Sequence, residues 1–177
     1  MAEDSQIADQ ERRYRGTAEA YGPAIARLAR GYEADAELAR DLVQDVHVAL
    51  WRSFAAYDGR CSERTWVYRV AHNAAADHVR ARKRLRAEAL VGLDEAAGFA
   101  DGGDPEAEAG ERQLLARLTR LIHRLKPADR QVMLLYLEDL TAAEIGEITG
   151  LSSGAVAVRI HRIKALLAQR FTQKEPA

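Results

Sequence analysis

The sequence has little of what stabilises secreted proteins or inserts a chain into a membrane. Cys61 is the single cysteine among 177 residues, so no disulfide can form within the chain and a reducing compartment is expected. No apolar run approaches the roughly 20 residues that span a bilayer. The acidic N-terminus also lacks the basic and apolar regions of a signal peptide. These absences predict a cytoplasmic protein without membrane insertion.

Prolines and aromatic residues are also scarce. Only 4 prolines and 6% aromatics accompany the 47% of hydrophobic residues, which suits a soluble helical protein. No strand-like alternation extends over a useful length, so we predict an all-α fold. The chain has no glycine-rich phosphate loop, and no metal-ligand spacing relates its five histidines, His47, His72, His78, His123 and His161. We therefore expect no metal, no cofactor and no catalytic activity.

Charge is distributed unevenly, although the formal net charge is only −1. A nucleic-acid-binding surface must therefore be local, and the segment RARKRLR, residues 80–86, concentrates positive charge. The acidic segment that follows has no sustained apolar period and cannot bury enough surface to order itself. We accordingly predict an N-terminal tail, a small helical domain, a flexible acidic linker, a second small helical domain and a C-terminal tail, at residues 1–13, 14–90, 91–112, 113–172 and 173–177.

Three helices are predicted in the first domain. The first covers about residues 17–31, with Pro23 tolerable only near its first turn. The second follows Asp35 and is amphipathic, with an acidic outer side and more apolar surface than one core stripe requires. That outer side is either a solvated face or a surface that docks on a partner. The third helix begins after the cap residue Ser62.

The third helix alternates aromatic and charged residues before it ends in the basic segment. Aromatic rings stack on unpaired bases, at ~1–3 kcal/mol per base, while cations follow the phosphate backbone. Trp66 and Tyr68 stand among Arg64 and Arg69, and Asn73 offers both a donor and an acceptor to a base edge. Either aromatic residue alone could equally fill a small core. Their combination with the basic segment favours binding to unpaired nucleic acid.

The second domain ends in a predicted helix–turn–helix. Thr141 and Glu144 have capping-box spacing, Gly150 suits a left-handed helix end, and Ser152 or Ser153 can cap the next helix. The buried side of that helix is predicted to carry Val156, Ile160, Ile163 and Leu167. A helix–turn–helix places its second helix in the major groove. The alternative is an ordinary helical hairpin within a core.

Three stretches of the sequence together resemble the extracytoplasmic-function (ECF) sigma factors of bacterial RNA polymerase. DLVQDVHVALW is similar to the polymerase-binding motif of sigma region 2. SERTWVYRVAHNAAADHVRARKR resembles the segment that melts and holds the minus-ten element. LKPADRQVMLLYLEDLTAAEIGEITGLSSGAVAVRIHRIKALL resembles sigma region 4, which docks on the polymerase flap and binds the minus-thirty-five element. The stretches occur in the family's order, and the resemblance extends over nearly the whole length of the chain.

The resemblance implies a sigma factor that directs core RNA polymerase to promoters, helps to open the DNA, and answers to an anti-sigma factor. Contacts with the polymerase clamp helices would come from Asp41, Leu42, Val43, Gln44 and Asp45. Minus-ten DNA would be contacted by Asp58, Gly59, Arg60, Arg64, Trp66, Tyr68, Asn73, Asp77, Arg80, Arg82, Lys83 and Arg84. Minus-thirty-five DNA would be contacted by Ser152, Ser153, Ala157, Val158, Arg159, His161, Arg162 and Lys164.

The sequence departs from the family pattern at several of these positions. Glu63 stands where a bulky apolar residue is usual, and Ala155 replaces a common threonine. Ala157 and Val158 replace a lysine and a serine. Apolar side chains can still contact thymine methyl groups, but they lose hydrogen-bonded base recognition. We therefore expect promoter choice to be shared with the minus-ten helix and with DNA shape.

Two other functions fit the same features. One is a transcription regulator that binds promoter DNA through its helix–turn–helix without polymerase. The other is an adaptor that competes for polymerase without opening promoters, which the presence of Trp66, Asn73 and the basic segment disfavours.

Overall fold

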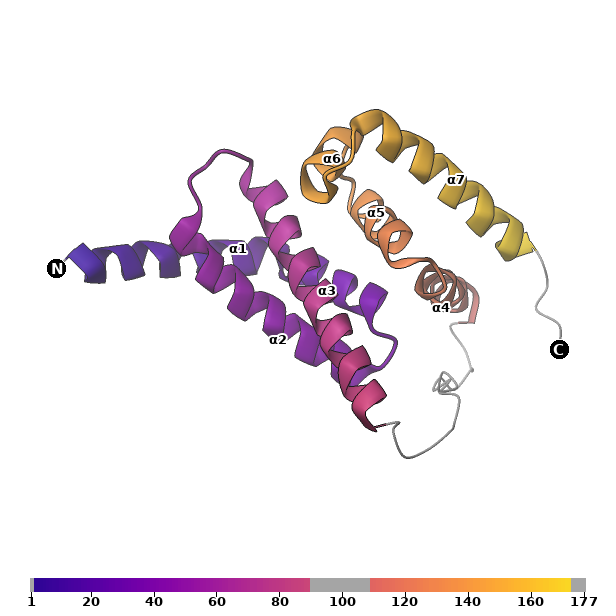
Figure 1. The fold of residues 1–177 in the computed structure, drawn as a ribbon, viewed down its shortest axis with the longest axis horizontal. Coiled ribbons are helices and arrows are strands. Elements are labelled where there is room, and N and C mark those ends of the chain that lie inside the picture. The colour runs from indigo at the N-terminus through magenta and orange to yellow at the C-terminus, as the bar shows by residue number, and fades with distance from the viewer. Residues whose placement is uncertain (1, 90–108, 173–177) are drawn as a thin grey trace.

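The computed structural model describes residues 2–89 and 109–172, and all regular structure within these ranges is helical. The first domain contains α1 (Ala2–Tyr32), α2 (Ala36–Ser53), the short 3-10 helix η1 (Phe54–Ala56) and α3 (Glu63–Ala89). The second contains α4 (Ala109–His123), α5 (Pro127–Leu137), α6 (Ala142–Thr149) and α7 (Ser153–Thr172). Figure 1 shows the two groups of helices side by side. The all-α prediction is confirmed.

Two predicted boundaries differ from the structure. The first helix begins at Ala2 rather than near residue 17, and Pro23 lies inside it. Contacts with α2 accompany this extension: Gln10 donates to the Trp51 carbonyl at 2.6 Å, and the Tyr14 hydroxyl lies 3.2 Å from Nδ1 of His47. Most of the predicted acidic linker lies outside the described residues. Helix α4 begins at Ala109, so the last residues assigned to the linker are helical.

The core of the first domain forms where α1, α2 and α3 meet. Leu42, Val46 and Leu50 are fully buried on α2, as expected for the apolar side of an amphipathic helix. They pack with Ile25 of α1 and with the small-residue seam of α3, where Ala71 has no exposed surface. Small residues allow neighbouring helices to approach closely. The third helix is consequently held along its length with a fixed rotation about its axis.

The helix–turn–helix forms as predicted. Thr141 and Glu144 make a complete capping box, and these hydrogen bonds lower the pKa of the Glu144 carboxyl. Gly150 is left-handed, with φ of 77°. Of the two candidate serines, Ser152 caps α7, because its Oγ accepts from the Ala155 N–H at 3.2 Å.

A second glycine that the sequence analysis missed shapes the same turn. A Cβ on Gly146 would lie 2.6 Å from the carbonyl oxygen of Leu151, which is closer than real Cβ atoms approach other atoms. The chain can therefore fold back over α6 only because residue 146 has no side chain. This close approach sets the position of α7 against α6.

Candidate nucleic-acid interface

The minus-ten candidates of α3 divide between two faces of the helix. With about 3.6 residues per turn, positions separated by three, four, seven or eleven residues share a face. Such spacing relates Trp66, Arg69, Asn73 and Asp77, and it extends to Arg80 and Arg84. Asn73, Asp77, Arg80 and Arg84 are exposed. We call this set the α3 stripe.

Three predicted contacts lie on the other side of α3. The Tyr68 side chain is 4% exposed, and burial raises the pKa of its phenol. Arg64 donates to the backbone carbonyl of Glu138, and Arg82 pairs with the buried carboxylate of Glu33. In this arrangement none of the three presents its polar group to a DNA strand on the α3 stripe. Tyr68, Arg64 and Arg82 belong to the same sequence motif as the stripe, and the motif alone does not show which face of the helix each residue occupies.

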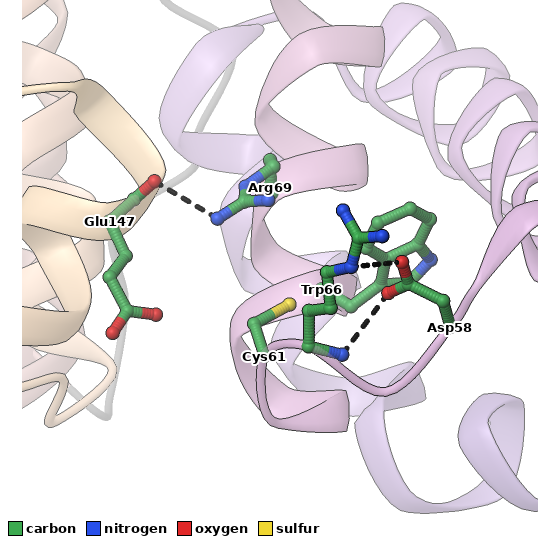
Figure 2. Close-up of a pocket in the computed structure, with 6 residues that line it drawn as sticks. Asp58, Cys61, Trp66, Arg69 and Glu147 are labelled. Carbon is green, nitrogen blue, oxygen red and sulfur yellow. Dashed lines mark hydrogen bonds and ion pairs between the residues drawn. The ribbon is translucent and has the colours of Figure 1, made fainter.

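The loop before α3 forms one wall of a pocket. Gly59 takes a φ of 76°, the Asp58 carboxylate accepts from the Arg60 N–H at 3.1 Å, and the Tyr57 hydroxyl donates to the Cys61 carbonyl. The cavity is about 430 Å³ in volume and is lined by Asp58, Arg60, Cys61, Trp66, Arg69 and Glu147. Figure 2 shows that Glu147 enters from the second domain, across from the side chains of the loop and α3.

Trp66 is half-buried and held in one orientation at this pocket. Its indole N–H donates to the Ser53 hydroxyl at 3.0 Å, and its ring centroid lies 5.2 Å from that of Tyr57. A base that enters the pocket would meet an aromatic ring that is already fixed. Less conformational entropy would then be lost when the base stacks.

The basic segment also contains two kinds of cation. Lys83 and Arg84 are exposed, and Arg80 pairs with Asp77 on the surface. Arg82 differs, because its partner Glu33 is only 7% exposed and also lies 3.6 Å from the His78 ring. Arg82 therefore compensates a buried charge inside the first domain.

The predicted polymerase-binding residues of α2 also divide by burial. Asp41, Gln44 and Asp45 are exposed, and Val43 is half-buried. Leu42 has no exposed surface, so its predicted contact with polymerase is wrong for this structure: it packs in the core and positions the helix.

Two apolar residues that the sequence analysis missed continue the exposed side of α2. Val48 is 48% exposed and Trp51 is 38% exposed. They follow Gln44 at spacings of four and seven residues, so the helical period places all three on one face. That period could have indicated the surface, but it could not show that the apolar side chains stay exposed.

The second candidate surface is the N-terminal half of α7. Ser152, Ser153, Ala157 and His161 are exposed there, and Val158 is 72% exposed. The cations lie at its edge and contact their own domain. Arg162 is 3.1 Å from the Asp129 carboxylate, with Arg159 at 3.5 Å from it, and Lys164 lies over the ring of Tyr136. The centre of this surface is therefore small and apolar.

Some functions find no support in the residues that the structure describes. Within residues 2–89 and 109–172, no group of three His, Cys, Asp or Glu side chains is placed to hold a metal ion. Among the helices described, none is both long and apolar enough to cross a membrane.

Comparisons with known proteins identify the class and then the family. Residues 17–85 match the family model for sigma-70 region 2, and residues 115–167 match the model for sigma-70 region 4. The ECF RNA polymerase sigma factor SigW of Bacillus subtilis is 30% identical over 141 residues, which are 75% of each chain. The sigma factor NccH of Alcaligenes xylosoxydans xylosoxydans is 28% identical, over 83% of this chain and 80% of its own.

A solved structure has the same fold. The sigma factor RpoE of Bartonella quintana, in complex with the anti-sigma factor NepR, matches with a TM-score of 0.68 at 16% identity, covering 88% of this chain and 94% of its own. The chain belongs to the ECF sigma factors of RNA polymerase. It is thus a transcription initiation factor whose family binds core RNA polymerase and promoter DNA.

Proposed function

We propose that the two candidate surfaces divide promoter recognition, with the α3 stripe and its pocket holding the opened minus-ten strand. The fixed ring of Trp66 carries this proposal, together with exposed Asn73 two turns further along the same face of α3. Both side chains suit unpaired bases, which exist only once the duplex has opened. Exposed Lys83 and Arg84 neutralise phosphates before and after opening. The polymerase performs the chemistry, and this chain is not an enzyme.

The α7 surface supplies the upstream contact. Its exposed centre of Ala157 and Val158 favours apolar contact with thymine methyl groups over hydrogen bonds to base edges. Arg159, Arg162 and Lys164 flank this centre and suit phosphates. Upstream recognition therefore depends more on position and DNA shape than on a hydrogen-bonding code.

Docking on the polymerase clamp is assigned to the exposed side of α2. Asp41, Gln44 and Asp45 supply its polar groups, and Val48 and Trp51 supply apolar area. Interfaces commonly combine an apolar anchor such as tryptophan with a polar rim. The α4–α7 domain is assigned to the polymerase flap.

Control by an anti-sigma factor in the cytoplasm completes the proposal. It is supported by the fold shared with a sigma factor that was solved with its anti-sigma factor. Such an inhibitor would act by covering the α2 surface or the DNA-facing surfaces.

Run-off transcription with purified core polymerase and a panel of promoters tests the function as a whole. We expect transcripts only when this chain is added. Asp41→Lys with Gln44→Lys should abolish them and weaken co-purification with core polymerase. Glu19→Lys, a charge reversal at an exposed position of α1, is the control and should retain both. Unchanged core binding by a folded double variant would show that α2 does not dock there.

A further inference from the structure

One face of α1 passes the end of α2, the start of α3 and the loop between them, residues 57–62, which we call the pocket loop. Gln10, Tyr14 and Thr17 follow one another at spacings of four and three residues, so they share this face. Arg13 borders it, three residues after Gln10 and four before Thr17. Figure 1 shows the N-terminal turns of α1 passing the end of α2. Because the family match begins only at residue 17, most of this segment lies outside the matched region.

The first contacts of this face anchor it to α2. The Gln10 amide donates to the Trp51 carbonyl at 2.6 Å, and the Tyr14 hydroxyl lies 3.2 Å from Nδ1 of His47. The rings of Tyr14 and His47 also meet edge to face, with centroids 5.9 Å apart. Two contacts one turn apart fix the rotation of α1 about its axis. They therefore fix the direction in which the next residues of this face point.

Arg13 contacts the first residue of the pocket loop. Its guanidinium carbon lies 5.8 Å from the ring centroid of Tyr57, where a cation is attracted to the face of the ring. The Tyr57 ring in turn lies 5.2 Å from the ring of Trp66 in the pocket. The neighbouring Arg12 and Arg15 pair instead with carboxylates of α1 itself. A chain of contacts thus leads from α1 through the loop to the pocket tryptophan.

Thr17 contacts the residue that follows the pocket loop. Its side chain is 1% exposed, and its hydroxyl donates to the carboxylate of Glu63, the first residue of α3, at 2.9 Å. Glu63 stands where the family usually has a bulky apolar residue. A hydrogen bond to a charged carboxylate is directional, whereas apolar packing is not. The unusual residue at position 63 therefore has a buried partner on α1 that sets its position.

The pocket loop itself has little to hold its orientation. Residues 58–60 are exposed, and Gly59 is left-handed, with φ of 76°. The bond from the Tyr57 hydroxyl to the Cys61 carbonyl, at 2.8 Å, joins loop residues to one another. Such a bond sets the shape of the loop, while its orientation towards α3 depends on the contacts at its two ends. Both ends are contacted from α1.

We propose that residues 10–17 of α1 position the pocket loop for the unpaired base, with Arg13 and Thr17 as the positioning residues. This deepens the proposed function and rests on it, because the pocket must first bind a base. Neither residue lines the pocket, so both act through the loop. Apparent affinity scales with the fraction of time in which a binding-competent arrangement is populated. Holding the loop in place therefore strengthens capture of the base.

Holoenzyme binding to a premelted bubble promoter provides the test. Affinity for the bubble reports capture of the opened strand, and affinity for the intact duplex at low temperature reports initial binding. 2-Aminopurine, placed in turn at each minus-ten position, reports by fluorescence which base the pocket holds. Arg13→Gln and Thr17→Val remove the two contacts. Arg12→Gln and Arg15→Gln are matched controls, with the same charge change at exposed positions of the same helix.

Arg13→Gln and Thr17→Val should each weaken binding to the bubble by about three- to tenfold and reduce the 2-aminopurine signal, because the loop is competent for less of the time. Binding to the closed duplex should not change, and the matched controls should change neither affinity. Thr17→Ser keeps the hydroxyl and should bind like the natural chain. Thr17→Val with Glu63→Leu supplies an apolar contact of the kind usual in the family and should recover most of the loss.

Several results would overturn the proposal. Equal losses on bubble and duplex templates would show that α1 only stabilises the first domain. A salt-dependence slope that is smaller by ~0.7 for Arg13→Gln on the bubble would show that Arg13 contacts a phosphate directly. If Trp66→Ala weakens bubble binding but Arg13→Gln and Thr17→Val do not, the loop needs no support from α1. If Trp66→Ala has no effect either, the proposed function of the pocket fails, and this inference fails with it.

Discussion

Helices α3 and α7 are both assigned to DNA, yet they present opposite kinds of surface. The pocket side of α3 carries a fixed tryptophan, an exposed asparagine and a row of cations, one of which, Arg69, donates to the C-terminal end of α6 in the second domain. The centre of α7 carries alanine and a valine that is 72% exposed, with its cations paired at the edge. Strong, specific groups therefore lie on the helix that the fold partly covers, and weak ones on the helix that it leaves open.

The largest expected effect tests the role of the α3 stripe in strand opening. Trp66→Ala should leave the closed complex nearly intact and slow promoter opening by about 10- to 100-fold, since stacking on one base is worth ~1–3 kcal/mol. Asn73→Ala should slow the same step, because its amide would hydrogen-bond to the edge of an unpaired base. Permanganate footprinting of unpaired thymines measures this. A premelted bubble template should rescue much of the defect. Failure of that rescue for Asn73→Ala would remove this residue from the opened strand.

The next effect concerns the fold that presents α7. Gly146→Ala should destabilise the second domain by about 1–3 kcal/mol, because the new Cβ meets the Leu151 backbone oxygen. Gly154→Ala in the first turn of α7 is the matched control, since a Cβ there meets nothing within 4 Å. Its higher helix propensity should make it neutral or slightly stabilising. Thermal unfolding followed by circular dichroism compares the two, and equal melting temperatures would contradict the tight-turn argument.

The core beneath α3 should respond to pH. Burial lowers the pKa of His72 to about 3 from an ordinary value of 6.5, and its Nδ1 lies 2.8 Å from the Tyr32 hydroxyl. Below pH 6.5 the unfolded chain binds a proton that the folded chain excludes. The free energy of unfolding should therefore fall by ~1.4 kcal/mol per pH unit from this residue as pH decreases from 6.5 towards 3.

Urea denaturation at pH 7.5, 6 and 5 measures that slope. Burial also lowers the pKa of His47 and His123, so these residues add to the slope in the same direction. His72→Phe should be less stable at pH 7.5, because the Tyr32 hydroxyl loses its partner. Its free energy of unfolding should, however, depend less steeply on pH, by ~1.4 kcal/mol per pH unit, because one group that takes up a proton on unfolding has been removed. If His72→Phe left the pH dependence of the unfolding free energy unchanged, folding would not lower the pKa of His72.

A smaller effect separates the two kinds of cation in the basic segment. Lys83→Ala with Arg84→Ala should weaken initial binding of the holoenzyme to all promoters, and each lost contact should reduce the salt-dependence slope by about 0.9. Arg82→Ala should instead destabilise the first domain, because it leaves the buried Glu33 without its main partner. Filter binding over a range of salt concentrations, beside urea denaturation, distinguishes them. If the salt dependence of binding changed for Arg82→Ala but not for Lys83→Ala with Arg84→Ala, the roles assigned to these cations would be reversed.

The smallest effect lies on α7. Val158→Ala should change folding stability by less than about 0.5 kcal/mol, because the side chain is exposed. Replacing thymine by uracil in the upstream element removes only the methyl group. We expect that replacement to weaken holoenzyme binding for the natural chain and to have less effect for Val158→Ala. Equal effects in both proteins would show that Val158 does not contact a thymine methyl group.

Much of the second domain follows from local sequence. The capping box at Thr141, the left-handed Gly150 and the apolar spacing of α7 each act within a few residues, so they could be predicted correctly. Gly146 was missed because its constraint is a contact with the carbonyl of Leu151, which only the folded turn brings near. Leu42 was misassigned for a similar reason. An apolar residue on an amphipathic helix has the same letter whether it faces a core or a partner.

The sequence by itself determined the helices, their caps, the order of the sigma regions and hence the family, because helical periodicity and capping are properties of short segments. Only the tertiary structure decided which side of α3 faces outward and where its arginines go. The Arg27–Glu138 pair joins positions 111 residues apart, and Arg69 reaches Glu147 across 78. Such contacts depend on how two domains pack, and no local pattern encodes them.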